Sequence, residues 1–107
     1  MAITATSTNG IHRGQVATGA HLDDAATPDA FSHNLGFDPR FVMVANETDG
    51  DPIWYWFEGM TSAHAIQASD HDTAQFTKLT SGGITVSNGT IGFTVTQNKQ
   101  YRWMAIG

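Results

Sequence analysis

The sequence predicts an all-β fold, and three of its features carry that prediction. Apolar and polar residues alternate over short stretches, as they do on the two faces of an extended strand. Turn-forming residues separate the stretches, including the hairpin pairs Asp49-Gly50 and Asn88-Gly89. No segment keeps an apolar stripe of helical period for ten residues. We therefore expect a compact antiparallel β-sandwich, jelly-roll-like, of about eight or nine short strands.

The first ten residues differ from the rest of the chain. They are small and polar, have no periodicity, and end in Asn9-Gly10. Chain ends of this kind are poorly ordered unless a partner holds them. We therefore expect residues 1–10 to form a flexible N-terminal arm, and residues 11–107 to form a single β-sandwich domain.

The first half of the chain supplies four of the expected strands. Gly36 closes the second of them, and Asp38-Pro39 starts the turn that leads into the third. The third strand has apolar residues on both faces, and the turn signal Asp49-Gly50 follows it. The expected strands are residues 11–22, 30–35, 40–46 and 53–57.

The strand at residues 53–57 combines five large apolar side chains. Ile53, Tyr55 and Phe57 share one face, and Trp54 and Trp56 share the other. An exposed face with two tryptophans would be an unusual patch on a monomer. Both faces are therefore expected to be covered, one by the core and the other by a second layer, a subunit or a ligand.

The second half of the chain supplies the remaining strands. Asn88-Gly89 predicts a two-residue hairpin, and Asn98-Lys99 predicts the turn before the last strand. The last strand ends beside the chain terminus, and pairing within a sheet would order it. The expected strands are residues 63–68, 75–80, 84–87, 90–96 and 100–106.

Strand alternation also assigns side chains to the core and to contact surfaces. A one-residue error in register would exchange the two faces. Subunit or partner contacts are expected at Trp54, Trp56, Met60 and, in the arm, Ile3. The expected core residues are Phe41, Val44, Ile53, Tyr55, Phe57, Ile84, Ile91, Phe93, Val95 and Trp103.

Charge and composition exclude several kinds of partner. The net charge is −5 and the five Lys and Arg residues are scattered, so the chain lacks the basic stripe that binds nucleic acid. No apolar run approaches the ~20 residues needed to span a membrane, and the N-terminus does not resemble a signal peptide. Charged residues make up only 14%, against ~25% in a typical domain, which suits surfaces partly covered by neighbours.

The residues that carry catalysis or bind metals are not arranged in recognisable motifs. The chain has no Cys, no Gly-x-Ser-x-Gly sequence and no phosphate-binding Gly loop, so we expect no enzyme activity and no cofactor. The acidic and His clusters at residues 21–24 and 70–72 are interpreted as solvated loops, and no metal site is expected. Residues 49–51 resemble part of a calcium loop, but the bidentate Glu is missing.

The aromatic residues leave two interpretations open. Trp54, Trp56, Tyr101 and Trp103 are expected to serve core and subunit packing. The alternative is an exposed aromatic shelf on which sugars stack, as in carbohydrate-binding β-sandwiches.

Several phrases of the sequence resemble those of a known group of proteins. Residues 35–48, Leu-Gly-Phe-Asp-Pro-Arg-Phe-Val-Met-Val-Ala-Asn-Glu-Thr, are similar to the LGF-x-P-x-x-V-x-V-x-N-x-T phrase of small tailed-phage virion proteins. The segments at residues 54–60, 80–86, 92–95 and 101–105 also fit, so the resemblance covers about residues 30–107. Members of that group are often capsid decoration (cement) proteins, and related modules end tail fibres and tail spikes.

The resemblance implies a binding role in the virion. It implies a protein that binds the major capsid protein on the outer capsid surface as a homotrimer and stabilises the shell. Such a protein would be made in the host cytoplasm without a signal peptide, and the resemblance supplies no catalytic residues. The alternative is a tail-fibre or tail-tip module that binds a host receptor or glycan, or another tail structural subunit.

Overall fold

The computed structural model describes residues 15–23, 29–69 and 75–107. Within these ranges the chain forms nine strands and no helix, so the predicted all-β class is confirmed. The arm expected at residues 1–10, and the start of the first expected strand, lie outside the described residues. The strands are β1 (Val16–Leu22), β2 (Asp29–Asn34), β3 (Phe41–Asn46), β4 (Ile53–Phe57), β5 (Ala65–Ala68), β6 (Phe76–Leu79), β7 (Thr85–Ser87), β8 (Thr90–Val95) and β9 (Gln100–Ile106).

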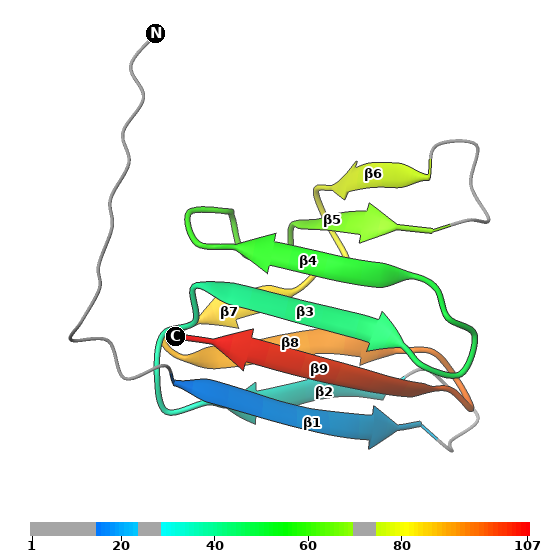
Figure 1. Cartoon of the computed structure of the whole chain (residues 1–107), viewed down its shortest axis with the longest axis horizontal. Helices are drawn as coiled ribbons and strands as arrows, with labels where there is room; N and C mark the ends of the chain where they lie inside the picture. The colour runs from blue at the N-terminus through cyan, green and yellow to red at the C-terminus, as the bar shows by residue number, and fades with distance from the viewer. Residues whose placement is uncertain (1–14, 24–28, 70–74) are drawn as a thin grey trace, which may run out of the picture.

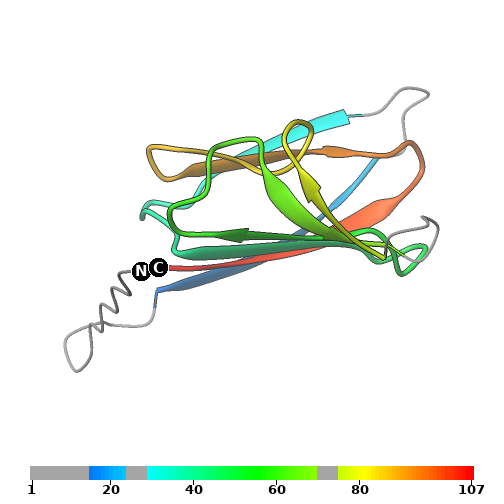
Figure 2. The same cartoon turned by 90° about the horizontal axis from the view of Figure 1, so that it is seen from above.

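The strands form two antiparallel sheets of unequal size. The larger sheet has six strands in the order β1-β9-β3-β4-β5-β6, and the smaller has three in the order β2-β8-β7 (Figure 1). Seen edge-on, β1, β9, β3 and β4 form one layer and β2, β8 and β7 form the other (Figure 2). The architecture is thus consistent with the predicted β-sandwich.

Two features predicted from the turns and the chain end are present in the structure. Asn88 and Gly89 both have positive φ, at 49° and 77°, as a tight hairpin turn between β7 and β8 requires. Strand β9 lies between β1 and β3 and pairs with both, so the C-terminal strand is held inside the larger sheet (Figure 1).

The core lies between the two sheets. Six of the expected core residues are confirmed as buried: Val44, Ile84, Ile91, Phe93, Val95 and Trp103. Among the described residues the buried apolar core also includes Val42, Trp54, Trp56, Ala65, Tyr101 and Ala105. Aromatic rings join the layers, since Phe31 of β2 lies 4.8 Å from Phe93 and 6.0 Å from Trp103 between ring centroids.

The prediction of which β4 side chains face the core is wrong, and the opposite set faces it. Trp54 and Trp56 are buried in the core, whereas Ile53 and Tyr55 are half-buried and Phe57 is exposed. Each indole finds an acceptor in the folded chain. Trp54 Nε1 donates to Gln67 Oε1 at 2.9 Å, and Trp56 Nε1 donates to the Thr61 carbonyl at 3.3 Å. Satisfying the indole N–H removes the main obstacle to burying these large rings.

The expected core position of Phe41 is wrong for a related reason. Phe41 and Val44 are three residues apart, so a regular strand cannot point both side chains to the same face. In β3 the inward positions are Val42, Val44 and Asn46, all buried. Phe41 therefore lies on the opposite face, where it is half-buried.

Candidate interaction surface

The outward side of the smaller sheet is polar. Because Phe31, Phe93 and Val86 pack toward the core, the neighbouring positions on β2, β8 and β7 point away from it. Those outward positions are Ala30, Ser32, Asn34, Thr85, Ser87, Thr90, Gly92 and Thr94. Small neutral side chains of this kind are readily solvated, so this side is suited to water.

The outward side of the six-stranded sheet, called here the outer face, is apolar. All but four of its positions carry apolar side chains, and the exceptions are Thr18, Gln100, Arg102 and Lys78. The apolar positions are Val16, Ala20, Leu22, Phe41, Met43, Ala45, Ile53, Tyr55, Phe57, Ile66, Ala68, Phe76, Met104 and Ile106. Within the described chain nothing packs over them as a third layer (Figure 2).

The outer face is comparable in area to the largest apolar patch on a typical monomer. Six strands ~4.8 Å apart and about 17–20 Å long cover roughly 400–500 Å² in projection. The largest apolar patch on a typical monomer is about 300–600 Å² and is often functional. Phe76 keeps 71% of its surface exposed and Phe57 keeps 49%, so the exposure is not confined to small side chains. A sandwich with one polar and one apolar outward side indicates a partner for the apolar side.

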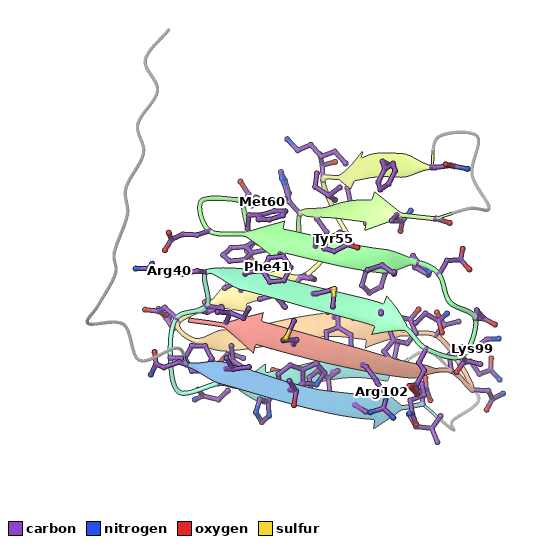
Figure 3. All side chains as sticks on the ribbon, in the orientation of Figure 1. Arg40, Phe41, Tyr55, Met60, Lys99 and Arg102 are labelled. Atoms are coloured by element: carbon purple, nitrogen blue, oxygen red, sulfur yellow. The ribbon has the colours of Figure 1, made fainter. Side chains whose placement is uncertain are left out.

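Three rings form an aromatic ridge on the outer face, defined here as Phe41, Tyr55 and Phe57. The Phe41 ring centroid lies 5.3 Å from that of Phe57 and 6.4 Å from that of Tyr55, with tilted planes. The register explains the grouping, since Phe41 of β3 is directly opposite Phe57 of β4. Figure 3 shows Phe41 and Tyr55 on these adjacent strands. Rings at this separation interact favourably and form one raised apolar feature.

A hollow of about 360 Å³ lies beside the ridge, over β1, β9 and β3. It is called here the methionine hollow, because Met43 and Met104 form part of its wall. Its depth comes from the short side chains at Thr18, Ala20 and Ala45, where longer ones would fill the space. The remaining lining residues are Gly19, Arg102 and Trp103.

A second hollow of about 270 Å³ lies at the far corner of the outer face. Ile53, Ala68 and Phe76 form its apolar side. Its polar side includes Asp51 and Ser69, and the Ser69 hydroxyl donates to the Asp51 carboxylate at 3.0 Å. This hollow is wide and open, and part of its polar lining is engaged within the chain.

Paired charges flank the outer face at the ends of β3 and β4. At one end Arg40 Nε lies 3.9 Å from Glu58 Oε2, and at the other Lys99 Nζ lies 3.0 Å from Asp49 Oδ1. Figure 3 places Arg40 and Lys99 at these opposite ends. The outer-face positions themselves include no Asp or Glu. An apolar centre bordered by a polar rim is the usual anatomy of a protein–protein interface.

The Glu47–Arg102 pair belongs to the same rim. Arg102 Nε donates a hydrogen bond to Glu47 Oε2, and Gln100 Nε2 donates to Glu47 Oε1 at 2.7 Å. The bond from Arg102 holds the pKa of Glu47 below its usual value, against a smaller opposing effect of desolvation. The same bond raises the pKa of Arg102. The pair is solvent-exposed, so it orients the Arg102 side chain more than it stabilises the fold.

The residues expected at partner contacts do not lie together on this surface. Trp54 and Trp56 are core residues, so the expectation that they face a partner is wrong for the folded chain. Met60 is half-buried and packs against the core, and its sulfur accepts from the Phe57 N–H at 3.2 Å. Ile3 lies outside the described residues.

Potential metal-binding side chains are not grouped in the described part of the chain. No three His, Asp or Glu residues lie close enough there to hold an ion. Asp49, in the calcium-loop-like segment, accepts instead from Asn46 Nδ2 at 2.9 Å and from Lys99. Residues 70–72 lie outside the described ranges. None of the described segments is a helix long and apolar enough to cross a membrane.

Comparison with known proteins gave no similarity on which to build. No family model, curated protein or solved structure matches the chain.

Proposed function

We propose that this chain is a bacteriophage capsid decoration protein that binds the major capsid protein on the outer capsid surface as a homotrimer. The observation that carries the proposal is the apolar outer face, which no described part of the chain covers. The resemblance of residues 35–48 to tailed-phage virion proteins directs the choice among protein-binding roles.

The two outward sides of the sandwich support a role built on protein contacts. The polar side of the smaller sheet tolerates water, whereas exposed Phe57 and Phe76 favour burial against another protein. A protein that binds only the assembled shell stabilises the assembled state by mass action. No reaction is needed for this effect.

The charge distribution supports an outward location on the virion. The net charge of −5 disfavours contact with packaged DNA and is compatible with the solvent-facing side of a shell. The carboxylates with described partners, including Glu47, Asp49 and Glu58, lie at strand ends and turns. Contacts through the outer face would therefore not bury unpaired carboxylates.

The test is binding of the purified protein to decoration-free capsids, with sedimentation equilibrium of the free protein in parallel. The expected result is a trimer that binds saturably at a stoichiometry set by the capsid lattice and raises the temperature at which the shells dissociate. Unassembled capsid protein is the control, since a decoration protein binds the lattice in preference to it. Absence of saturable binding would overturn the proposal.

A tail location is the outcome that a failed capsid experiment would favour. The glycan-binding alternative invoked Trp54, Trp56, Tyr101 and Trp103 as a sugar-stacking shelf, but all four are buried. The exposed rings are instead those of the aromatic ridge and Phe76. Binding to host cells or to a glycan array, with no binding to capsids, would assign the chain to the tail.

A further inference from the structure

We infer that the outer face packs against a second copy of this chain, with the aromatic ridge of one copy seated in the methionine hollow of the other. The inference rests on the self-association part of the proposed function and assigns the outer face to contact between copies, so capsid binding would use another surface of the oligomer. Four observations support it: the lack of a cover within the described part of the chain, the chemistry of the hollow, the placement of the ridge, and the distribution of charge.

The described part of the chain leaves the outer face uncovered, and the remaining residues supply few large apolar side chains. The ranges that the structure leaves undescribed are 1–14, 24–28 and 70–74. Their large aliphatic or aromatic side chains are limited to Met1, Ile3 and Ile11. Three such side chains cannot cover a face of roughly 400–500 Å² that displays four aromatic rings.

The methionine hollow has the chemistry of a site for an aromatic ring. Thioether sulfurs make favourable contacts with ring edges, and Met43 and Met104 both line the hollow. A guanidinium stacks on an aromatic face, and Arg102 lies at the same hollow. The short side chains of Ala20 and Ala45 leave the room that a ring needs.

The same surface that offers the hollow also displays suitable rings. The ridge lies on β3 and β4, and the hollow lies over β1, β9 and β3, so the two features are neighbours. Met43 of the hollow is directly opposite Tyr55 of the ridge in the β3–β4 register. The ridge and the hollow lie side by side and make the face self-complementary. A two-fold-related copy fills both at once in a dimer, whereas in a trimer each ridge enters the hollow of the next copy. Sheets stacked in this way lie ~10 Å apart.

The charges permit two acidic copies to approach through this face. Each copy carries −5, but no outer-face position is acidic, and Arg102 is already paired with Glu47 at the rim. The projected area of roughly 400–500 Å² is more than half of the ~800 Å² per partner that a standard interface buries, and contacts from the flanking turns would add to it. A partner with a strongly charged surface would fit this face poorly.

The first experiment measures self-association of four single variants by sedimentation. Phe57→Ser removes a ring of the ridge, and Ala45→Lys places a charge in the hollow. Each is expected to raise the dissociation constant about tenfold or more, as loss of a central contact does. The matched controls are Ser32→Lys and Thr94→Lys, both on the outward side of the smaller sheet. Both controls are expected to associate like the unchanged chain.

The second experiment locates the contact directly and uses the absence of native Cys. Two single variants, Phe57→Cys and Ala45→Cys, are mixed at a concentration above the dissociation constant of the weaker variant and treated with a short bismaleimide. Cross-linked dimers containing one copy of each variant are expected. A mixture of Phe57→Cys with Thr94→Cys serves as the control and is expected to give none.

The outcomes separate this inference from the capsid proposal. The inference is overturned if the chain is monomeric at every concentration, or if neither Phe57→Ser nor Ala45→Lys weakens its self-association. This holds even if the chain binds capsids. Self-association with the expected cross-link, without capsid binding, retains the inference and overturns the capsid proposal. A dimer in place of a trimer retains the inference and corrects the expected stoichiometry.

Discussion

The indole ring of Trp103 lies directly against Gly19 on the neighbouring strand. A Cβ atom at residue 19 would come within 2.7 Å of ring atoms Cε2 and Cζ2. The two residues are paired across β1 and β9, so the contact forms where the edge strand joins the larger sheet. Gly19 is required here for space, because the indole occupies the volume that any side chain would take.

Gly19→Ala is therefore expected to destabilise the fold. The ring of Trp103 is buried and rigid, so overpacking against it is expected to cost about 1–3 kcal/mol. Urea denaturation of the variant measures this loss. Ala20→Ser, on the outward side of the same strand, is the control and is expected to lie within about 0.5 kcal/mol of the unchanged chain. Equal stability of the two variants would contradict the observed contact.

Adjacent residues of β4 are expected to differ sharply in their effect on stability. Trp54→Ala removes a buried ring and leaves Gln67 Oε1 without its donor, at an expected cost of about 3–5 kcal/mol. Tyr55→Ala trims a half-buried outer-face ring, and the expected loss is smaller. Both are measured by chemical denaturation at concentrations where the chain is monomeric. A greater loss for Tyr55→Ala would restore the face assignment expected from the sequence.

The strands were predictable because their signals are local. Alternation within each strand and Gly- or Asn-containing turns between strands predicted all nine, including the hairpin at Asn88-Gly89. In β9 the expected core residue Trp103 is buried, and Tyr101, two residues earlier on the same face, is buried as well although it was not among the expected core residues.

The facing of β3 and β4 was not predictable from hydrophobicity, because both of their sides are apolar. Trp54 and Tyr55 are both large aromatic residues, and only the tertiary partners decide between them. The deciding contacts are distant in sequence: Gln67 accepts from Trp54, and Tyr101 lies 5.6 Å away between ring centroids. The interaction surface is the face that the core does not use. The same ambiguity therefore kept the aromatic ridge from being predicted from the sequence.

Gly89→Ala is expected to weaken the β7–β8 hairpin. Gly89 has a φ of 77°, which costs an L-residue roughly 1–2 kcal/mol. An added Cβ would also lie 3.1 Å from the Phe37 carbonyl oxygen, in a segment held by the Leu35 N–H bond to the Gly89 carbonyl. Thermal unfolding of this variant measures the loss. Asn88→Gly, at the neighbouring positive φ, is the control, and no comparable loss is expected because glycine tolerates that conformation.

The Glu47–Arg102 pair is expected to stabilise the folded chain slightly at neutral pH and to lose this effect in acid. The hydrogen bond from Arg102 lowers the pKa of Glu47 in the folded chain. A depressed carboxyl pKa contributes stability above the unfolded-state pKa, and the contribution is lost as the pH falls through the folded-state value. The unchanged chain is therefore expected to be more stable than Glu47→Gln at neutral pH, and the difference should vanish in acid. Because the pair is exposed, salt should reduce it.

An NMR titration of the Glu47 carboxyl carbon measures the cause of this term directly. The titration midpoint is expected below the usual Glu value in the unchanged chain. It should rise toward that value in Arg102→Met, because the largest of the pKa-lowering contacts is removed while the hydrogen bond from Gln100 remains. A midpoint that does not move on loss of the guanidinium would show that Arg102 does not hold Glu47, and the rim at the methionine hollow would then lack its fixed cation. Arg102→Met would also remove the guanidinium that can stack on an aromatic ring in the methionine hollow. This variant is therefore expected to show both weaker self-association and a raised Glu47 titration midpoint.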